Sequence, residues 1–303
     1  MENTKIGQEN AEMLREVGKA SYRALLEAKS GIRPGRKLID VACDVEKYLK
    51  ESGYGMAFPI NLSIGTQAAH YTPSVADEKV FGEGDVIKVD FGAEKQGILG
   101  DCALTMDLSG NYQKLVEATD LALQNAISIV KSGVKVSAVG IEIGKTIRSM
   151  GFEPIKNLGG HSVEKHSLHS NIFIPNYDNK DETELEEGQV IAIEPFATDG
   201  AGFVTESDIC DIFSFGQSVG VRSSDARLLL KHIESNYPSE PFAARWLVGV
   251  LESDFRLYAA IAELCRAEAL VRYPTLMETS KGIVAQSEVE VLVGKDSCEV
   301  LTK

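Results

Sequence analysis

The sequence lacks long hydrophobic runs. No stretch of its 303 residues approaches the roughly 18 apolar residues that a membrane-spanning helix needs. The first residues, MENTKIGQENAEMLRE, have neither the basic head nor the apolar core of a signal peptide. Cysteine is scarce as well, and its five residues are far apart, which argues against a disulfide framework or a CxxC zinc site. These absences predict a cytoplasmic protein that does not cross a membrane and whose thiols are reduced and mostly buried.

Positive charge is also in short supply. Lysine and arginine together number 31, against 45 for aspartate and glutamate, which gives a formal net charge of -14. Such a surface repels a polyanionic backbone, so we expect no specific nucleic-acid partner. Hydrophobic residues make up 44% of the chain, as in ordinary globular proteins. The length allows one large domain with an insertion, or two domains.

The same order of predicted helices and strands occurs twice along the chain. In each half, apolar residues spaced three and four apart predict two consecutive helices, and a strand-like stretch follows, MAFPINLSI in the first half and FEPIKNLGGHS in the second. The predicted helices run over 7–30 and 38–49 in the first half, and over 115–130 and up to Gly151 in the second. The tripeptide Lys-Ser-Gly closes the first helix of each pair, at Gly31 and at Gly133.

A strand motif repeats in the same way. The segment EGDVIKVDFGA at 83–93 aligns without gaps on EGQVIAIEPFA at 187–197. Each copy has a Glu-Gly turn signal before a short β-branched run, which is typical of a buried strand. Asp90 falls opposite Glu194 in this alignment, so each strand ends in a carboxylate. We infer an α+β fold with two pseudo-symmetric halves that share one site.

The segment 206–275 differs in character from both halves. Apolar spacing at 228–233 and at 246–251 predicts helices, and prolines punctuate them. Beyond this segment the pattern KGIVAQSEVEVLV returns to strand-like alternation. We therefore predict a main domain of residues 1–205 and 276–303, interrupted by an inserted helical subdomain of residues 206–275.

Four of the five histidines lie in two short segments. His70 is part of AAHYTP, and His161, His166 and His169 are part of GGHSVEKHSLH. His161 and His169 flank a glycine-preceded loop, where backbone can approach a ligand closely. We interpret the isolated His232 as a structural or surface residue and His166 as a solvated one.

Carboxylates at the ends of apolar strands suggest a bound cation. Such a group costs free energy unless it is paired or bound to a metal, and this applies to Asp90 and Glu194. Asp101 follows Asp90 after a short polar stretch, so a hairpin would aim both carboxylates at one point. Glu288 lies in the last predicted strand. Taken singly, Asp101 is also compatible with a turn residue and Glu288 with an exposed strand residue.

Four carboxylates and at least one imidazole form an oxygen-rich ligand set, which suits a pair of Mn, Fe, Co or Zn ions. Such a pair activates one water and polarises a carbonyl, as amide hydrolysis requires. Motifs for other chemistries are absent from the sequence, namely the GxSxG elbow, the GxxxxGKS/T phosphate loop, GxGxxG after a strand and HExxH.

Five segments resemble, in order and spacing, the motifs of methionine aminopeptidases: FPINLSIGTQAAHYTP, KVDFGAEKQGILGDCALT, GGHSVEKHSLHSNIFIPN, AIEPFATDGAG and AQSEVEVLV. The segment with ARWL and RYPTL is similar to the insert of the type II class, and the short N-terminus looks archaeal. The resemblance implies the pseudo-symmetric pita-bread fold and a hydrolase that removes the initiator methionine from nascent proteins during their maturation. It also implies two divalent metal ions per chain, with Co, Mn, Fe and Zn as candidates.

The resemblance assigns roles to individual residues. It implies these metal ligands: Asp90, Asp101, His161, Glu194 and Glu288. By the same carry-over, His70 and His169 contact the substrate and stabilise the tetrahedral intermediate, and Glu194 also shuttles a proton. Phe58 and Tyr273 match positions that line the pocket for the methionine side chain. The implied partners are nascent polypeptide N-termini, with transient ribosome contact, and the chain is expected to be a monomer.

The sequence departs from the family pattern after the last ligand. Where the family usually reads Phe-Glu-His-Thr, this chain has Ser287-Glu288-Val289-Glu290, and Phe203 stands where a basic residue is common. Residues two apart on a strand share a face, so Glu290 is expected to point toward the metals. There it would strengthen cation binding or be neutralised by a lysine or arginine. A solvated strand end is the alternative.

Two other functions compete with methionine removal. The first is a proline-directed peptidase of the same fold, although such enzymes usually carry an additional N-terminal domain and the shared motifs here begin by residue 58. The second is a non-catalytic relative that binds ribosomes or RNA. Such relatives lose metal ligands and tend to be basic, whereas this chain retains all the ligand residues and is acidic.

Overall fold

The computed structural model describes residues 10–303. The first half contains α1 (Ala11–Gly31), α2 (Leu38–Glu51), β1 (Gly55–Met56), β2 (Asn61–Ile64), β3 (Gln67–Ala69), β4 (Val86–Phe91), β5 (Ala93–Lys95), β6 (Ile98–Leu99) and β7 (Cys102–Asp107). The second half contains α3 (Gln113–Ile129), α4 (Val136–Ser149), β8 (Glu153–Pro154), β9 (Gly159–Val163), β10 (Phe173–Pro175), β11 (Val190–Ile193), β12 (Phe196–Thr198) and β13 (Val204–Glu206). The remaining elements are β14 (Ile212–Phe215), α5 (Ser224–Asn236), β15 (Phe242–Ala243), the 3-10 helix η2 (Ala244–Leu247), α6 (Asp254–Arg266), β16 (Leu270–Tyr273), β17 (Leu276–Glu278), β18 (Val284–Gln286), β19 (Glu288–Val293) and β20 (Cys298–Val300).

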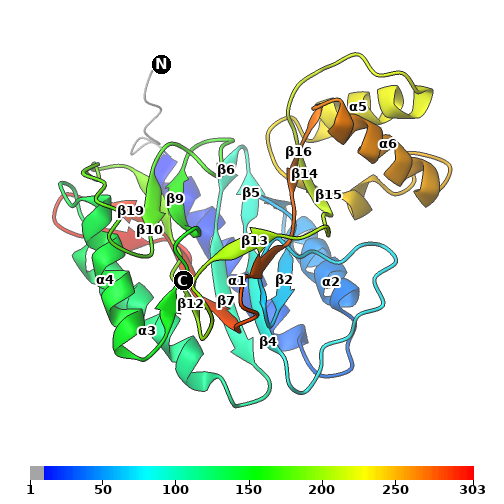
Figure 1. Cartoon of the computed structure of the whole chain (residues 1–303). Helices are drawn as coiled ribbons and strands as arrows, with labels where there is room; N and C mark the ends of the chain where they lie inside the picture. The colour runs from blue at the N-terminus through cyan, green and yellow to red at the C-terminus, as the bar shows by residue number, and fades with distance from the viewer. Residues whose placement is uncertain (1–9) are drawn as a thin grey trace.

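The largest sheet has eight strands and explains the internal repeat. Its order is β10-β9-β11-β19-β7-β4-β2, with β20 on β19, and all its pairs are antiparallel. The two halves meet where β19 pairs with β7, so the strands β4 and β11, which carry the repeated motif, lie at equivalent distances from this seam. Mixed helices and antiparallel sheets confirm the α+β class (Figure 1).

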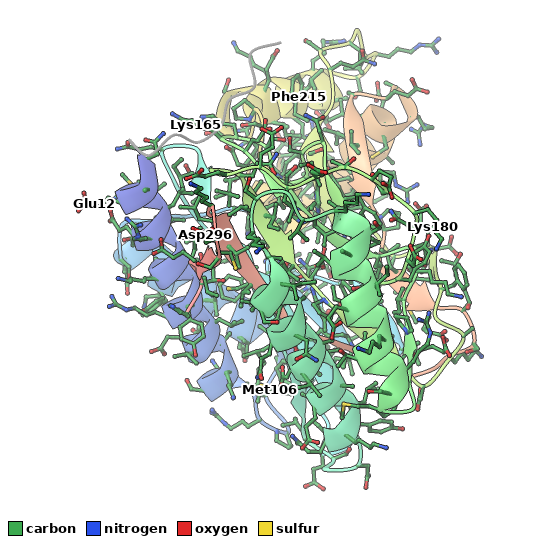
Figure 2. The ribbon with its side chains drawn as sticks, turned by 90° about the vertical axis from the view of Figure 1, so that its left-hand side faces the viewer. Glu12, Met106, Lys165, Lys180, Phe215 and Asp296 are labelled. Atoms are coloured by element: carbon green, nitrogen blue, oxygen red, sulfur yellow. The ribbon has the colours of Figure 1, made fainter. Side chains whose placement is uncertain are left out.

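The helices cover one face of the sheet and leave the other for the site. Ile87, Val89 and Phe91 of β4 pack in one apolar cluster with α1 and α2, and Ile191 and Ile193 of β11 pack in a second with α3 and α4. Figure 2 shows α3 and α4, in green, side by side over the second half. Successive residues of a strand point to opposite faces, so Asp90 of β4 points away from the side that carries Val89 and Phe91, and Ala192 of β11 points away from the side that carries Ile191 and Ile193.

The turn before the second helix of each half requires a glycine. Of the two glycines that end the repeated tripeptide, Gly31 and Gly133, only Gly133 lies in such a turn. Gly35 and Gly133 both adopt a φ of +82°, and each lies two residues before the residue that precedes α2 or α4. Gly31, in contrast, belongs to the last turn of α1. The repeated tripeptide Lys-Ser-Gly is therefore not the structural equivalent in the two halves. The feature that is equivalent in the two halves is the left-handed glycine of the turn, Gly35 or Gly133.

Two further sequence predictions need correction. The stretch MAFPINLSI does not form one strand but two, β1 and β2, because Pro59 between them has no N–H for a ladder hydrogen bond. The five cysteines are free thiols as expected, but Cys102 alone among them is fully buried and Cys43 is exposed.

Residues 7–9 of the first predicted helix lie outside the described residues. No helix within residues 10–303 is long and apolar enough to cross a membrane.

The segment 206–275 is not purely helical. It contains α5, α6 and a three-stranded sheet of order β15-β14-β16, and its apolar residues form a cluster of their own between Phe213 and Leu270. Figure 1 shows this part set apart from the large sheet, at the upper right. The apolar spacing at 246–251 does not mark an α-helix, since η2 ends at Leu247 and Gly249 adopts a φ of +88°.

The segment is tied to the first half by a buried arginine. Arg245, at the start of η2, forms an ion pair with Glu46 of α2 and donates to the Oγ1 atom of Thr72 at 2.6 Å. The indole Nε1 of the neighbouring Trp246 donates to the same carboxylate at 2.9 Å. These contacts fix the segment relative to the strands that carry the candidate site.

Candidate metal centre

Strand register brings the predicted ligands to one face of the sheet. Ala103 of β7 pairs with Asp90 of β4 on one side and with Glu288 of β19 on the other. Ala192 of β11 likewise pairs with His161 of β9 and with Glu290 of β19. Directly opposed residues of antiparallel strands point the same way, so these side chains project from the face that the helices leave free.

All the predicted site residues line one cavity of about 340 Å³. It contains the side chains of Phe58, His70, Asp90, Asp101, His161, His169, Glu194, Tyr273 and Glu288. Its wall also includes Leu168, Phe196 and Ile212, so a charged floor is combined with apolar sides. Cavities that combine a few convergent polar groups with apolar walls are typical of substrate sites.

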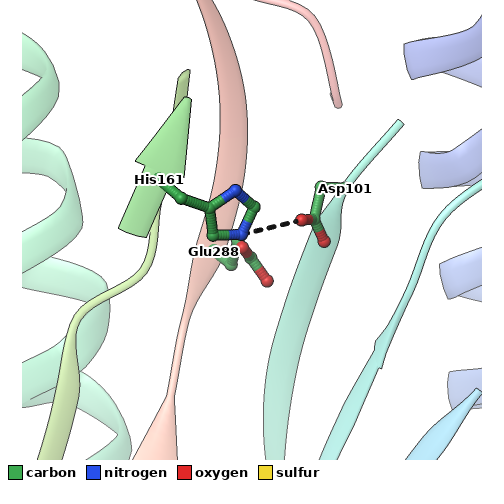
Figure 3. Close-up of side chains that lie close together, drawn as sticks. All are labelled: Asp101, His161 and Glu288. Carbon is green, nitrogen blue, oxygen red and sulfur yellow. Dashed lines mark ion pairs between the residues drawn. The ribbon is translucent and has the colours of Figure 1, made fainter. Parts of the chain in front are cut away.

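The charged end of the cavity has ligand atoms at metal-binding spacing. One donor atom from each of Asp101, His161 and Glu288 lies within 4.8 Å of the other two (Figure 3). His161 Nε2 is 3.4 Å from Asp101 Oδ2 and 3.9 Å from Glu194 Oε1. Each side chain comes from a different strand or strand end, so the site depends on the assembled sheet.

The electrostatics of this cluster call for a cation. Burial raises the pKa of Asp90 to about 7, and it raises the pKa values of Asp101, Glu194 and Glu288 well above their usual range. Neighbouring carboxylates raise the pKa values of Asp101, Glu194 and Glu288 further. Asp90 Oδ1 and Asp101 Oδ1 are buried, and neither has a hydrogen-bond partner within residues 10–303. Burial also lowers the pKa of His161 to about 3, which leaves its imidazole neutral. Unpartnered carboxylate oxygens and a neutral imidazole fit divalent metal ions.

His70 and His169 lie beside this cluster. The His169 ring is 4.2 Å from that of His161, and the His70 ring is 5.8 Å from that of Tyr273, centroid to centroid. His70 adopts a φ of +64°, an uncommon conformation that clusters at functional sites. Burial lowers the pKa of His70 to about 4. Its Nδ1 atom donates to the carbonyl oxygen of Pro274 at 3.3 Å, so Nε2 of the neutral ring is an acceptor.

One side chain at the site escaped the sequence interpretation. Gln286 is buried beside three of the carboxylates, and a lone glutamine in a strand gives no compositional signal of such a role. His166 is exposed, as expected, and in addition it bonds through Nδ1 to Glu240 Oε1 at 3.0 Å. It therefore links the loop before His169 to the segment that carries α5 and α6.

The departures after the last ligand are accommodated by the fold. The Ser287 hydroxyl donates to Asp120 Oδ1 at 2.5 Å and lies 2.8 Å from Thr119 Oγ1, so α3 supplies the polar partners it needs. Val289 packs against the second apolar cluster. Glu290 is not a solvated strand end, because only 1% of its surface is exposed. The Nζ atom of Lys156 lies over the ring of Phe203, 5.0 Å from the ring centroid.

Glu290 adds an acid next to the predicted ligands. The backbone N–H of Asp101 donates to its carboxylate, yet burial raises its pKa to about 8. Its charge in turn raises the pKa of Asp101, and its Oε2 atom has no hydrogen-bond partner in the described part of the chain. A cation nearby would favour the ionised form of Glu290.

We expect Glu290→Thr to weaken divalent-metal binding without removing a ligand. Loss of one nearby negative charge should cost about 1 kcal/mol, or roughly fivefold in the dissociation constant. Calorimetric metal titrations at low salt, at pH 7.0 and 8.5, would measure it. The difference from the parent should be larger at pH 8.5, where Glu290 is more fully ionised. Superimposable titrations at both pH values would show that Glu290 plays no part.

Comparisons with known proteins agree with the geometry. A model of metallopeptidase family M24 matches residues 12–229. The proteins named methionine aminopeptidase from Thermococcus onnurineus and Pyrococcus horikoshii are 44% and 41% identical to this chain, over 96% and 97% of its length and 99% and 100% of theirs.

Solved structures are similar over nearly the whole chain. A methionine aminopeptidase from Thermotoga maritima superimposes with a TM-score of 0.72 at 24% identity, over 98% of both chains. A prolidase from Pyrococcus furiosus gives a TM-score of 0.64 at 18% identity, over 98% of this chain and 64% of that one. These likenesses confirm the expected pita-bread fold.

Proposed function

The chain belongs to metallopeptidase family M24, and from this membership and the cavity we infer that it is a metal-dependent methionine aminopeptidase. It removes the N-terminal methionine from polypeptides by hydrolysis of the first peptide bond. The observation that carries this conclusion is full-length similarity, at 38–44% identity, to archaeal proteins of that name.

The alternatives are not favoured. The prolidase structure is only 18% identical, and this chain spans 64% of its length. A non-catalytic relative has no need of a buried carboxylate cluster, which is costly to keep without a cation.

The proposed metal centre holds two divalent ions. We assign Asp90, Asp101, His161, Glu194 and Glu288 as the residues that would hold them, and Asp101, His161 and Glu288 already lie with one donor atom each within 4.8 Å of one another. The bound ions would lower the pKa of a water molecule and polarise the peptide carbonyl. Oxygen-rich sites with one imidazole accept Co, Mn, Fe or Zn.

The remaining polar groups position the substrate and move protons. Glu194 takes a proton from the attacking water as the C–O bond forms and the tetrahedral intermediate appears, and it then delivers this proton to the amine as the C–N bond breaks. His169 donates a hydrogen bond to the carbonyl oxygen as negative charge develops there. His70, whose Nδ1 already donates to Pro274, is suited through Nε2 to accept from a substrate N–H. This refines the donor role that family resemblance implies for His70.

The apolar wall sets the side-chain specificity. Phe58 and Tyr273 both line the cavity. Phe58, which is 7% exposed, comes from the first half, and Tyr273 comes from the end of segment 206–275. We propose that they hold the methionine side chain, and that segment 206–275 is an insert that completes this pocket. We further propose that the protein is a monomer that acts on nascent chains in the cytoplasm and contacts the ribosome transiently.

A tripeptide assay tests the function. Purified protein loaded with Mn²⁺ or Co²⁺ should release methionine from Met-Ala-Ser, and a chelator should abolish the release until metal is restored. Acetyl-Met-Ala-Ser should resist cleavage, since an aminopeptidase needs a free amine. Cleavage of Ala-Pro dipeptides in preference to Met-Ala-Ser would instead establish the proline-directed activity.

A further inference from the structure

One neutral side chain lies among the metal-binding carboxylates. Gln286, the last residue of β18, is fully buried. Its Nε2 atom donates to Asp90 Oδ2 at 3.2 Å, Glu194 Oε2 at 3.3 Å and Glu288 Oε2 at 3.4 Å. These acceptors come from β4, the end of β11 and β19, so a single amide contacts both pseudo-symmetric halves and the seam strand.

Charge fixes the orientation of this amide. An amide nitrogen offers two N–H donors, which the three carboxylate oxygens share, whereas the amide oxygen is an acceptor and would face three further acceptors if the group were turned round. With the nitrogen toward the carboxylates, Gln286 Oε1 is buried and has no partner among residues 10–303. Leaving it so costs free energy, and the fold tolerates that cost to bring the nitrogen to the cluster.

The backbone beneath this side chain is held in place. The Oγ1 atom of Thr105 on β7 donates to the carbonyl oxygen of Gln286 at 2.7 Å and accepts from its N–H at 2.8 Å. Gln286 also pairs with Phe196 of β12 in the three-stranded sheet of order β18-β12-β8. The amide is therefore carried by a rigid support rather than by a mobile loop.

The amide contacts one oxygen of each carboxylate and leaves the other. Asp90 Oδ2 accepts from Gln286, whereas Asp90 Oδ1 has no hydrogen-bond partner in the described chain. Glu194 Oε2 accepts from Gln286, whereas Glu194 Oε1 lies toward His161 Nε2, at 3.9 Å. We propose that Gln286 is a positioning residue that holds these three carboxylates so that their second oxygens are presented to the metal ions. The inference rests on the proposed metal site and deepens it.

The variant Gln286→Met tests the proposal, because methionine has similar length and no donor. We expect the metal-free variant to fold, and its affinity for Mn²⁺ or Co²⁺ in calorimetric titration to be 10 to 100 times weaker than the parent's, the loss typical of a ligand-supporting group. At saturating metal, kcat for Met-Ala-Ser should fall while KM stays near the parent value. Gln124→Met, on the exposed side of α3, is the matched control and should titrate as the parent does.

Two results would overturn the proposal. One is a Gln286→Met protein with parental metal affinity, which would show a packing role at most, and the other is a Gln286→Met protein whose metal affinity falls no more than that of Gln124→Met. If Gln286→Met fails to fold, Thr105→Val keeps the amide and removes its support, and it should weaken metal binding several-fold in the same titration. Parental affinity in Thr105→Val would then contradict the proposal. A parent that binds metal in this Gln286-dependent way but does not cleave Met-Ala-Ser would refute the proposed function and leave this inference standing.

Discussion

Asp101→Asn should lose most bound metal and more than about 10³-fold of its peptidase activity. If Asp101 is a ligand of both proposed ions, its loss should exceed the roughly 10²- to 10³-fold cost of losing one transition-state donor. Asp101 lies at the seam of the two halves, 2% exposed, with its Oδ1 unpartnered within residues 10–303. The variant should still fold, since the neighbouring carboxylates repel the charge that the substitution removes. Metal content and kcat/KM for Met-Ala-Ser measure the effect.

Asp296→Asn provides the matched control for this variant. Asp296 is exposed in the turn between β19 and β20 and lies outside the cavity (labelled in Figure 2). It should retain parental metal content and activity. An Asp101→Asn protein that binds two ions and remains active would contradict the ligand assignment.

Alanine at His70 or His169 should lower kcat by roughly 10² to 10³, with bound metal unchanged. Neither histidine belongs to the cluster formed by Asp101, His161 and Glu288, although the His169 ring is only 4.2 Å from that of His161. Each is expected to form a hydrogen bond that matters most in the transition state. Single-turnover rates and metal content, measured on the same preparation, separate these effects.

His232→Ala provides the histidine control, since His232 lies on α5 away from the cavity. It should behave as the parent does. Loss of metal in His169→Ala would show that this ring is a ligand, and unchanged rates in both site variants would remove them from the mechanism.

The spacing of apolar residues predicts the helices of the two halves, because each of these helices packs one apolar face against the sheet. The spans over 38–49 and 115–130 correspond closely to α2 and α3. Segment 206–275 is harder to predict, since its three short strands pair only with one another and bury apolar residues without regular alternation. Trp246 and Leu247 fit a helical spacing with residues 250 and 251, yet the left-handed Gly249 between them breaks it.

The candidate site is predictable where its chemistry is local to a motif. Asp90, His161 and Glu288 stand in recognisable segments, and all three line the cavity. Gln286 is different, because its role depends on β18 approaching strands that are distant in sequence. The environment of Glu290 likewise depends on segments distant in sequence, because its backbone pairs with Ala192 of β11 and its N–H donates to Thr302 Oγ1 at 2.9 Å.

The most direct test of the metal assignment is a crystallographic anomalous difference map of the Mn²⁺-loaded protein. It should show two peaks roughly 3.5 to 4 Å apart in the cavity. Both should lie within ligand distance of carboxylate or imidazole atoms from the set Asp90, Asp101, His161, Glu194 and Glu288. No peak among these side chains, or peaks bound elsewhere in an active protein, would contradict the account.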